Sequence, residues 1–151
     1  MINENSLKIS CGIDTLYYFC ESNEKYDDLY LEILDQMEKI KSVFVDREIE
    51  YQYRDIHITL KEMSFEYLGK NEGFHWFRDI NGYFKIGFKD SFTNTGLHDI
   101  RVQLQAEGIY TLGIPTLLIL INKTLFGQYT TGNNTITRID LNCFVQHDLS
   151  F

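Results

Sequence analysis

The segment Thr135-Ile-Thr-Arg-Ile-Asp-Leu-Asn-Cys-Phe-Val145 alternates polar and apolar side chains over most of its length. Successive side chains of a β-strand point to opposite faces, so one face takes the apolar series and the other takes Arg138, Asp140 and Asn142. The pattern predicts a half-buried strand with a charged outer face. A solvated Arg138 and Asp140 pair is the simplest interpretation, and contact of Asp140 with a metal or a phosphate is the alternative.

The size and charge of the chain limit what it can be. With 151 residues and no internal repeat or linker-like segment, residues 1–151 are expected to form a single domain with its own core. Twenty-two acidic and 14 basic residues give a formal net charge of −8. This sign disfavours nonspecific coating of nucleic acid, which depends on clustered Lys and Arg. Any nucleic-acid binding must therefore rest on a local basic patch.

The cysteines and the apolar runs bear on the compartment. Cys11, Cys20 and Cys143 are odd in number and lack a Cys-x-x-Cys spacing, so they indicate neither a disulfide framework nor a zinc site. The first residues do not resemble a signal peptide, and the longest apolar run, 114–121, is far shorter than the roughly 20 residues that span a bilayer. We expect a soluble, cytoplasmic protein with no membrane partner.

The period of the apolar residues changes along the chain. Apolar residues recur every three or four positions over 25–43, which predicts an amphipathic helix, and a second, more apolar helix is expected from Pro115 to Gly127. Turns are expected over 69–73 and 132–134. Strands are expected over 8–20, 48–53, 55–63, 83–89, 98–106 and 135–145. The order strand, helix, strands, helix, strand predicts an α+β fold: a mostly antiparallel sheet with two helices packed on one face.

Basic and aromatic residues on these strands are candidates for a nucleic-acid site. Lys85, Lys89, Arg101 and Arg138 would form a local basic patch if their strands are neighbours, although a solvated sheet face explains them as well. The run Phe74-His-Trp-Phe77 is either a platform for base stacking or an ordinary core strand.

Two segments together resemble a known family. Ile100-Arg-Val-Gln-Leu-Gln-Ala-Glu-Gly108, then an apolar helix, then Ile136-Thr-Arg-Ile-Asp-Leu-Asn142 resemble the N-terminal half of the rolling-circle replication initiators of plasmids and filamentous phages, the replication initiation factor group. In that group a strand with a Ser-Gly-Gln-Gly-like turn precedes a helix and a strand of the form Thr-Arg-Ile-Asp. The opening Cys11-Gly-Ile-Asp-Thr-Leu-Tyr-Tyr-Phe19 is similar to its first strand. The layout covers nearly the whole chain, and 137–141 is its most specific part.

The resemblance implies a nicking-joining enzyme, in which a tyrosine attacks a DNA phosphodiester while Mg²⁺ or Mn²⁺ held by carboxylates polarises the phosphate. Asp140 takes the position of a metal ligand, with Gln103 and Asn142 as neighbours on the site face. Two positions depart from the group: Phe144 stands where a second Asp is usual, and Gln103 where a Glu is frequent. The loss of two oxygen ligands would weaken metal binding. The nucleophilic tyrosine of the group lies downstream, so no catalytic residue is expected in this chain.

Two functions remain as expectations. The first is an origin-binding domain of a rolling-circle initiator, directed at single-stranded or hairpin DNA and incomplete or inactive on its own, either as a piece of a longer initiator or as a remnant. The alternative is a noncatalytic protein-interaction module that forms a homodimer through an aromatic surface. The net charge of −8 and the missing carboxylates favour the alternative.

Overall fold

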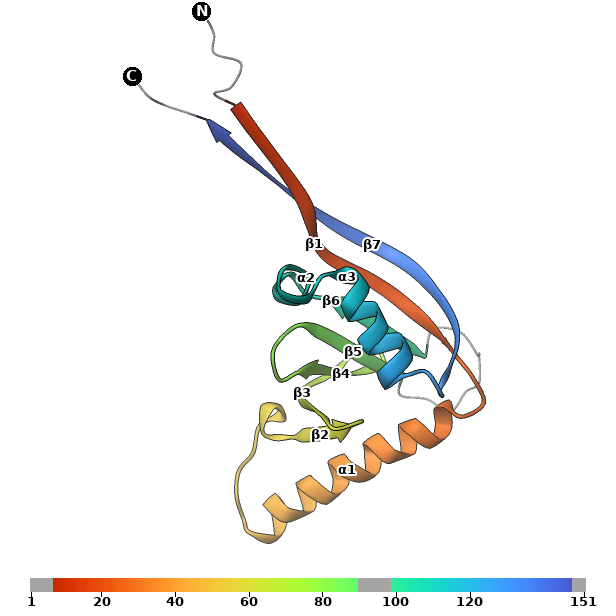
Figure 1. Cartoon of the computed structure of the whole chain (residues 1–151). Helices are drawn as coiled ribbons and strands as arrows, with labels where there is room; N and C mark the ends of the chain where they lie inside the picture. Colours follow the sequence, from red (N-terminus) through yellow and green to blue (C-terminus); the bar gives the residue numbers. More distant parts are fainter. Residues whose placement is uncertain (1–6, 90–98, 148–151) are drawn as a thin grey trace, which may run out of the picture.

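The protein forms one seven-stranded sheet with helices packed against it (Figure 1). The computed structural model describes residues 7–89 and 99–147. All strand pairs are antiparallel, and the strand order is β2-β3-β4-β5-β6-β1-β7. The strands are β1 (Leu7–Ser22), β2 (His57–Leu60), β3 (Met63–Asn71), β4 (Phe74–Asp79), β5 (Phe84–Lys89), β6 (Ile100–Leu104) and β7 (Thr130–His147). The predicted α+β class and the antiparallel sheet are confirmed.

The helices agree with the sequence in part. The helix α1 (Tyr26–Asp46) matches the first predicted helix. The second predicted helix corresponds to α3 (Ile114–Leu118) and the π-helix η3 (Ile119–Leu125). A further helix, α2 (Ala106–Leu112), was not predicted: the strand expected to reach 106 ends at Leu104, and Gly113 at φ 82° separates α2 from α3. The described residues hold no single helix long and apolar enough to cross a membrane; α2 with the helix after it reaches that length and composition as a pair bent by 106°.

Two local predictions are wrong. Residues 49–52 pair with no described strand, and the 3₁₀ turn η2 (Tyr53–Asp55) follows them, so there is no strand over 48–53. Residues 132–134 lie inside β7: Asn134 pairs with Cys20 and Thr130 with Ser22, and the register shift between these two pairs leaves 131–133 opposite Glu21, with Gly132 at φ 90°. The turn predicted over 69–73 is shorter than expected: β3 continues to Asn71, and Glu72 and Gly73, both at positive φ, connect it to β4.

The core lies between the helices and one face of the sheet. Alternate residues of the central strands, such as Ile86 of β5 and Val102 of β6, are fully buried on that face. Ile33 of α1 and Ile121 of η3 are buried against the same cluster. We call the opposite face of the sheet, which carries Lys85 and Arg101, the open face.

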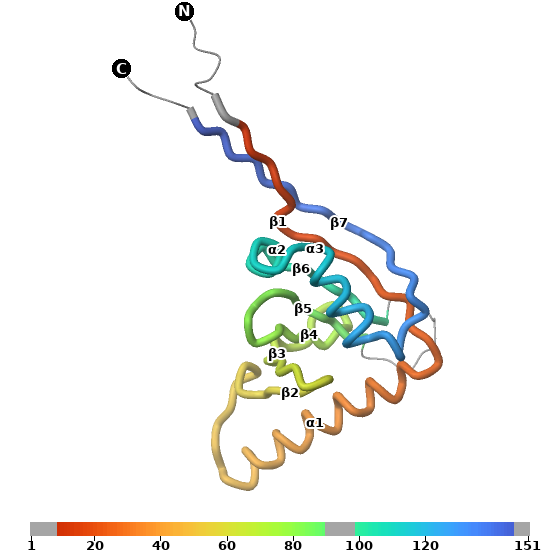
Figure 2. The backbone as a smooth tube through the Cα atoms, viewed as in Figure 1, coloured from red at the N-terminus to blue at the C-terminus, as the bar shows by residue number. Residues whose placement is uncertain are grey.

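The two longest strands form a ribbon that extends beyond the rest of the sheet (Figures 1 and 2). Leu16–Cys20 of β1 pairs with β6 as well as with β7, whereas the first part of β1, residues 7–13, pairs with β7 alone. Cys11 and Cys143 are directly opposite in this ribbon, with Cα atoms 4.1 Å apart, and are joined by a disulfide. The expectation of no disulfide is therefore wrong, because the sheet brings together two cysteines that are 132 positions apart in sequence.

Polar groups are buried where η3 meets β1. The Tyr18 hydroxyl donates to Asn122 Oδ1 at 3.1 Å, and the Cys20 thiol lies 3.8 Å from the same oxygen. Burial raises the pKa of the Cys20 thiol to about 12. Burial also raises the pKa of Tyr18, and the neighbouring Cys20 adds to that effect. Both groups are therefore held in their neutral, protonated forms.

This burial predicts a loss of stability in alkali. The unfolded thiol titrates near its ordinary value of 9.0, while the folded thiol stays protonated to about 12. The stability is thus fully present below pH 9 and declines as the pH rises toward 12, by up to about 1.4 kcal/mol per pH unit for one group. Urea unfolding across this range should show a steeper decline for the wild type than for Cys20→Ala. Equal slopes for the two proteins would contradict a buried titrating thiol.

Candidate nucleic-acid interface

A row of mostly polar residues crosses the open face from β3 to β7. Each member is directly paired with the next in the strand register, and neighbouring strands lie about 4.8 Å apart. In order across the sheet, the row consists of Glu66, Arg78, Lys85, Gln103, Tyr17 and Arg138. We call it the polar row. It aligns three cationic side chains, Arg78 and Lys85 from the consecutive strands β4 and β5 and Arg138 from the distant strand β7.

A second row runs beside it, one step along the strands. Trp76 of β4, Gly87 of β5, Arg101 of β6 and Phe19 of β1 are paired in succession, and we call them the aromatic row. Because Gly87 has no side chain, the indole of Trp76 lies directly over it: a Cβ at position 87 would be 3.0 Å from ring atoms of Trp76. Cross-strand glycine–aromatic pairs of this kind bring the ring flat against the sheet.

Arg101 is held between aromatic rings. Its guanidinium carbon is 4.3 Å from the ring centroid of Phe74 and 5.2 Å from that of Phe19. The Nε atom is buried and has no hydrogen-bond partner among the described residues. Stacking on two rings fixes the plane of the guanidinium, which lines a hollow on this face, whereas the covered Nε is not accessible to a ligand.

Members of both rows line a hollow of about 420 Å³. Its lining combines aromatic and cationic side chains with the loop between β3 and β4 and with Thr137 of β7. The side chains that line the hollow include Tyr17, Phe19, Trp76, Lys85, Arg101 and Gln103. A concave surface with half-buried rings and positive charge is typical of sites that stack unpaired bases and contact phosphates.

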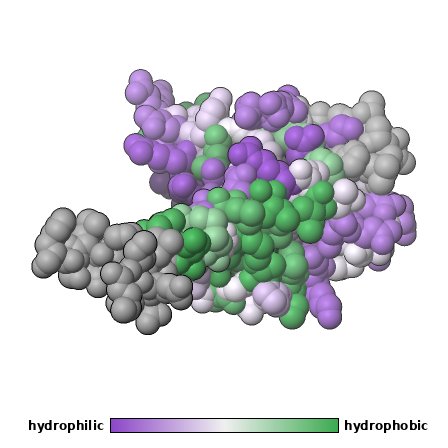
Figure 3. Space-filling model, turned by 90° about the horizontal axis from the view of Figure 1, so that it is seen from above, coloured by the Kyte–Doolittle hydropathy of each residue, from purple (hydrophilic) through white to green (hydrophobic). Residues whose placement is uncertain are grey.

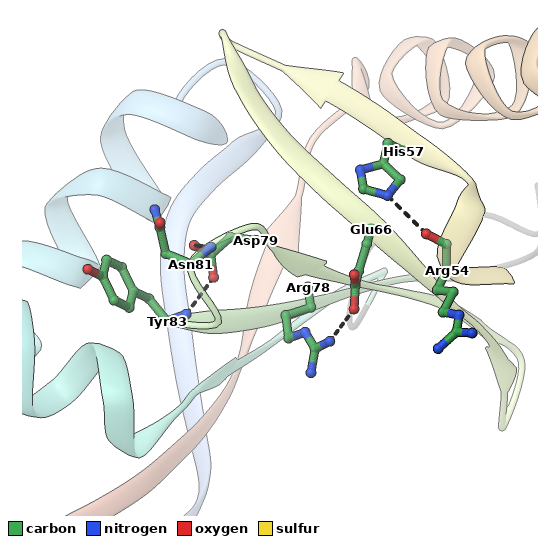
Figure 4. A network of polar contacts seen from close by, with 7 residues as sticks. All are labelled: Arg54, His57, Glu66, Arg78, Asp79, Asn81 and Tyr83. Atoms are coloured by element: carbon green, nitrogen blue, oxygen red, sulfur yellow. Dashed lines mark hydrogen bonds and ion pairs between the residues drawn. The ribbon is translucent and has the colours of Figure 1, made fainter.

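Ion pairs limit which cations of the polar row are available. Arg78 is bonded to Glu66 on the adjacent strand, as Figure 4 shows, so its charge is neutralised locally. Arg138 donates through Nε to Asp140 Oδ1 at 2.7 Å, and its guanidinium also lies 5.0 Å from the ring centroid of Tyr17. The hydrogen bond and the charge of Asp140 raise the pKa of Arg138, so that it stays cationic.

The predicted site residues are distributed unevenly over this face. Lys85, Arg101 and Gln103 line the hollow. Arg138 does not line it, but it is paired with Tyr17, which does. Lys89 is opposite Phe74 at the end of β5 and does not line the hollow. The two lysines differ because of strand register: Lys85 belongs to the polar row, whereas Lys89 lies four residues farther along β5.

Asp140 and Asn142 lie farther along β7, on the ribbon. Asp140 accepts the bond from Arg138 described above, and Asn142 donates to Tyr110 Oη at 2.6 Å and to Asp14 Oδ1 at 3.2 Å. Within residues 7–89 and 99–147, no three His, Cys, Asp or Glu side chains are arranged to hold a metal ion. One carboxylate already paired with an arginine does not fit Mg²⁺ or Mn²⁺, which take several oxygen ligands.

Several residues of the interface were not among the predicted ones. Tyr17, Phe19 and Arg78 alternate with buried residues on their strands, so their outward position could have been predicted from period 2. Trp76 was weighed as a stacking residue, and the structure places it half-buried on the open face, while Phe77 is fully buried in the core.

Much of the negative charge lies away from this interface. The helix α1 alone carries six acidic and two basic side chains, and it packs on the opposite side of the sheet. Segregation of this kind allows a local positive surface on a protein with a net charge of −8.

Comparison with family models, with curated proteins and with solved structures gives no match to this chain.

Proposed function

We propose that the open face binds single-stranded DNA, and that the chain serves as the DNA-binding domain of a rolling-circle replication initiator. The observation that carries the proposal is the hollow in which Trp76, Lys85 and the stacked Arg101 meet. The resemblance of 100–108 and 136–142 to that group of initiators supports the origin as the target. Nicking chemistry is not part of the proposal.

The shape of the surface favours an unpaired strand over a duplex. Duplex readers insert a helix or a two-stranded ribbon into a groove, whereas unpaired bases stack on aromatic rings that lie on a sheet. Trp76 lies flat over Gly87, and Phe19 is in the same row on the other side of Arg101. These rings would receive bases, while Lys85 and Arg101 would contact phosphates.

A salt-dependent titration with single-stranded DNA tests the proposal. We expect Lys85→Ala to weaken binding by roughly threefold to tenfold and to make the plot of log K against log salt less steep by about 0.7, the value for one lost phosphate contact on a single strand. The lysine lines the hollow and belongs to the polar row. Lys39→Ala is the matched control, since Lys39 is an exposed cation on α1 with a side chain 75% accessible.

The control distinguishes a defined site from general charge. Equal losses for Lys85→Ala and Lys39→Ala would indicate that overall charge alone governs binding. Absence of saturable binding at low salt would overturn the proposal and leave the noncatalytic interaction module as the better function.

A further inference from the structure

The two edges of the sheet differ in whether their backbone groups have hydrogen-bond partners. At the β2 edge, the Gln36 side chain of α1 donates to Thr59 O and accepts from Thr59 N, both at 2.8 Å, which occupies the edge backbone as another strand would. At the other edge, β7 is 18 residues long, and no described strand pairs with its outer side. Soluble proteins normally cover or interrupt an edge of this length, because its free backbone groups pair readily with another strand.

Apolar side chains accompany this edge. On the side of the ribbon that continues the core face, Leu141 is 71% exposed, Ile9 64% and Val145 62%, and Ile136 and Ile139 are exposed as well. Figure 3 shows a continuous hydrophobic surface in this part of the molecule. These side chains present on the order of 400 Å² of apolar surface, within the roughly 300–600 Å² of the largest patch on a typical monomer, which is often a functional surface.

The charges on β7 are self-complementary in one register. In an antiparallel pair of identical strands the two-fold axis is perpendicular to the sheet, so it passes through one residue and pairs residues equally spaced on its two sides. With the axis at Ile139, Arg138 of each copy is opposite Asp140 of the partner subunit. An axis at 138 or 140 would place like charges opposite each other, and an axis at 141 would place Arg138 opposite Phe144.

We infer that the chain forms a homodimer in which β7 pairs antiparallel with β7 of a second copy about Ile139. The pairing joins two sheets edge to edge and brings the exposed apolar residues of both ribbons onto one continuous face. Cross-strand contacts between the apolar side chains of the two β7 strands, together with the hydrogen bonds of the paired backbone, stabilise the dimer. The charge register selects a second copy of this chain over an unrelated strand.

A cysteine placed on the axis tests the register directly. Opposite Cα atoms in an antiparallel pair are about 4.5–5.5 Å apart, within the range that a disulfide spans. We expect Ile139→Cys to form a covalent dimer under mild oxidation on a nonreducing gel. Val43→Cys, on the exposed side of α1 at 48% accessibility, should stay monomeric on the same gel. Cys20 is buried and Cys11 is bonded to Cys143, so the native cysteines do not compete.

Charge reversal provides a second measurement that does not depend on oxidation. Arg138→Asp and Asp140→Arg should each weaken the dimer at least tenfold in sedimentation equilibrium, because each places like charges opposite each other across the axis. The double exchange Arg138→Asp with Asp140→Arg should restore it. A protein that is monomeric at all concentrations, or no crosslink through residue 139, would overturn the inference.

The dimer and the DNA site can fail separately. The hollow is centred on β5, β6 and β1, whereas the dimer axis is on β7. Reduced Ile139→Cys should bind single-stranded DNA through an unchanged hollow, and Lys85→Ala should leave the sedimentation of the dimer unchanged.

Discussion

Replacement of Trp76 by alanine is expected to weaken binding of single-stranded DNA by about tenfold to a hundredfold, because stacking of one base on an aromatic ring contributes roughly 1–3 kcal/mol. Trp76 is the largest ring in the hollow, and it lies over Gly87 in the centre of the open face. The dissociation constant of the wild type is measured from the fluorescence of the one tryptophan in the chain. That of the variant is measured from the anisotropy of a labelled oligonucleotide.

The controls for this prediction separate stacking from folding. Trp76→Phe keeps a ring and should retain most of the affinity. Tyr51→Ala removes another exposed ring, which stacks on Phe44 at 5.2 Å beside α1, and should leave binding unchanged. An affinity of Trp76→Ala within twofold of the wild type, in a protein with an unchanged circular dichroism spectrum, would refute a stacking role.

The position of Trp76 on the open face depends on the register between β4 and β5, because the residue opposite it is a glycine. Any side chain at position 87 would press on the indole at less than van der Waals distance, since an added Cβ lies 3.0 Å from ring atoms of Trp76. The glycine of β5 is therefore as much a part of the interface as the tryptophan of β4. Neither residue alone predicts the stacking surface, because that surface depends on the pairing of Trp76 with Gly87 across the two strands.

The sequence was sufficient for statements that depend on local periodicity. Alternation placed Lys85, Arg101 and Arg138 on strands, and the three- and four-residue spacing placed α1 within a few residues of its bounds. The turn predicted over 132–134 is an irregularity within a strand: Gly132 is at φ 90° and the register shifts there, but β7 pairs with β1 on both sides of the shift, so the strand does not end.

What the sequence could not supply is the order of strands in the sheet. The polar row joins residues from six strands, and its members become neighbours only through the order β3-β4-β5-β6-β1-β7. The same order brings Cys11 opposite Cys143, which sequence spacing alone argued against. Residues that meet through nonlocal pairing have no signature in one sequence, since no short-range pattern records which strands are adjacent.

The buried carboxylate that organises the β4–β5 turn should have the largest effect on stability. Asp79 is 2% exposed, and its Oδ1 accepts from the backbone N–H of Tyr83 at 2.6 Å (Figure 4) and of Phe84 at 2.9 Å, while Oδ2 accepts from Asn81 N at 3.2 Å. Asp79→Ala leaves these donors without their acceptor, and the free energy of unfolding should fall by about 3 kcal/mol. Urea denaturation measures the change.

Asp79→Asn distinguishes the hydrogen bonds from the charge, because an amide oxygen can still accept from Tyr83 and Phe84. Its loss should be about 1 kcal/mol, and Asp35→Ala, at an exposed carboxylate of α1, should change stability by less than about 0.5 kcal/mol. A loss for Asp79→Ala no larger than for Asp35→Ala would contradict the role of the turn. Asp79 directly follows Arg78 and the turn leads into Lys85, so the bonds that stabilise the fold here also set the register of the polar row. Folded Asp79→Asn should therefore bind DNA with unchanged affinity. Conditions that unfold this hairpin should cause a loss of DNA binding at the same time.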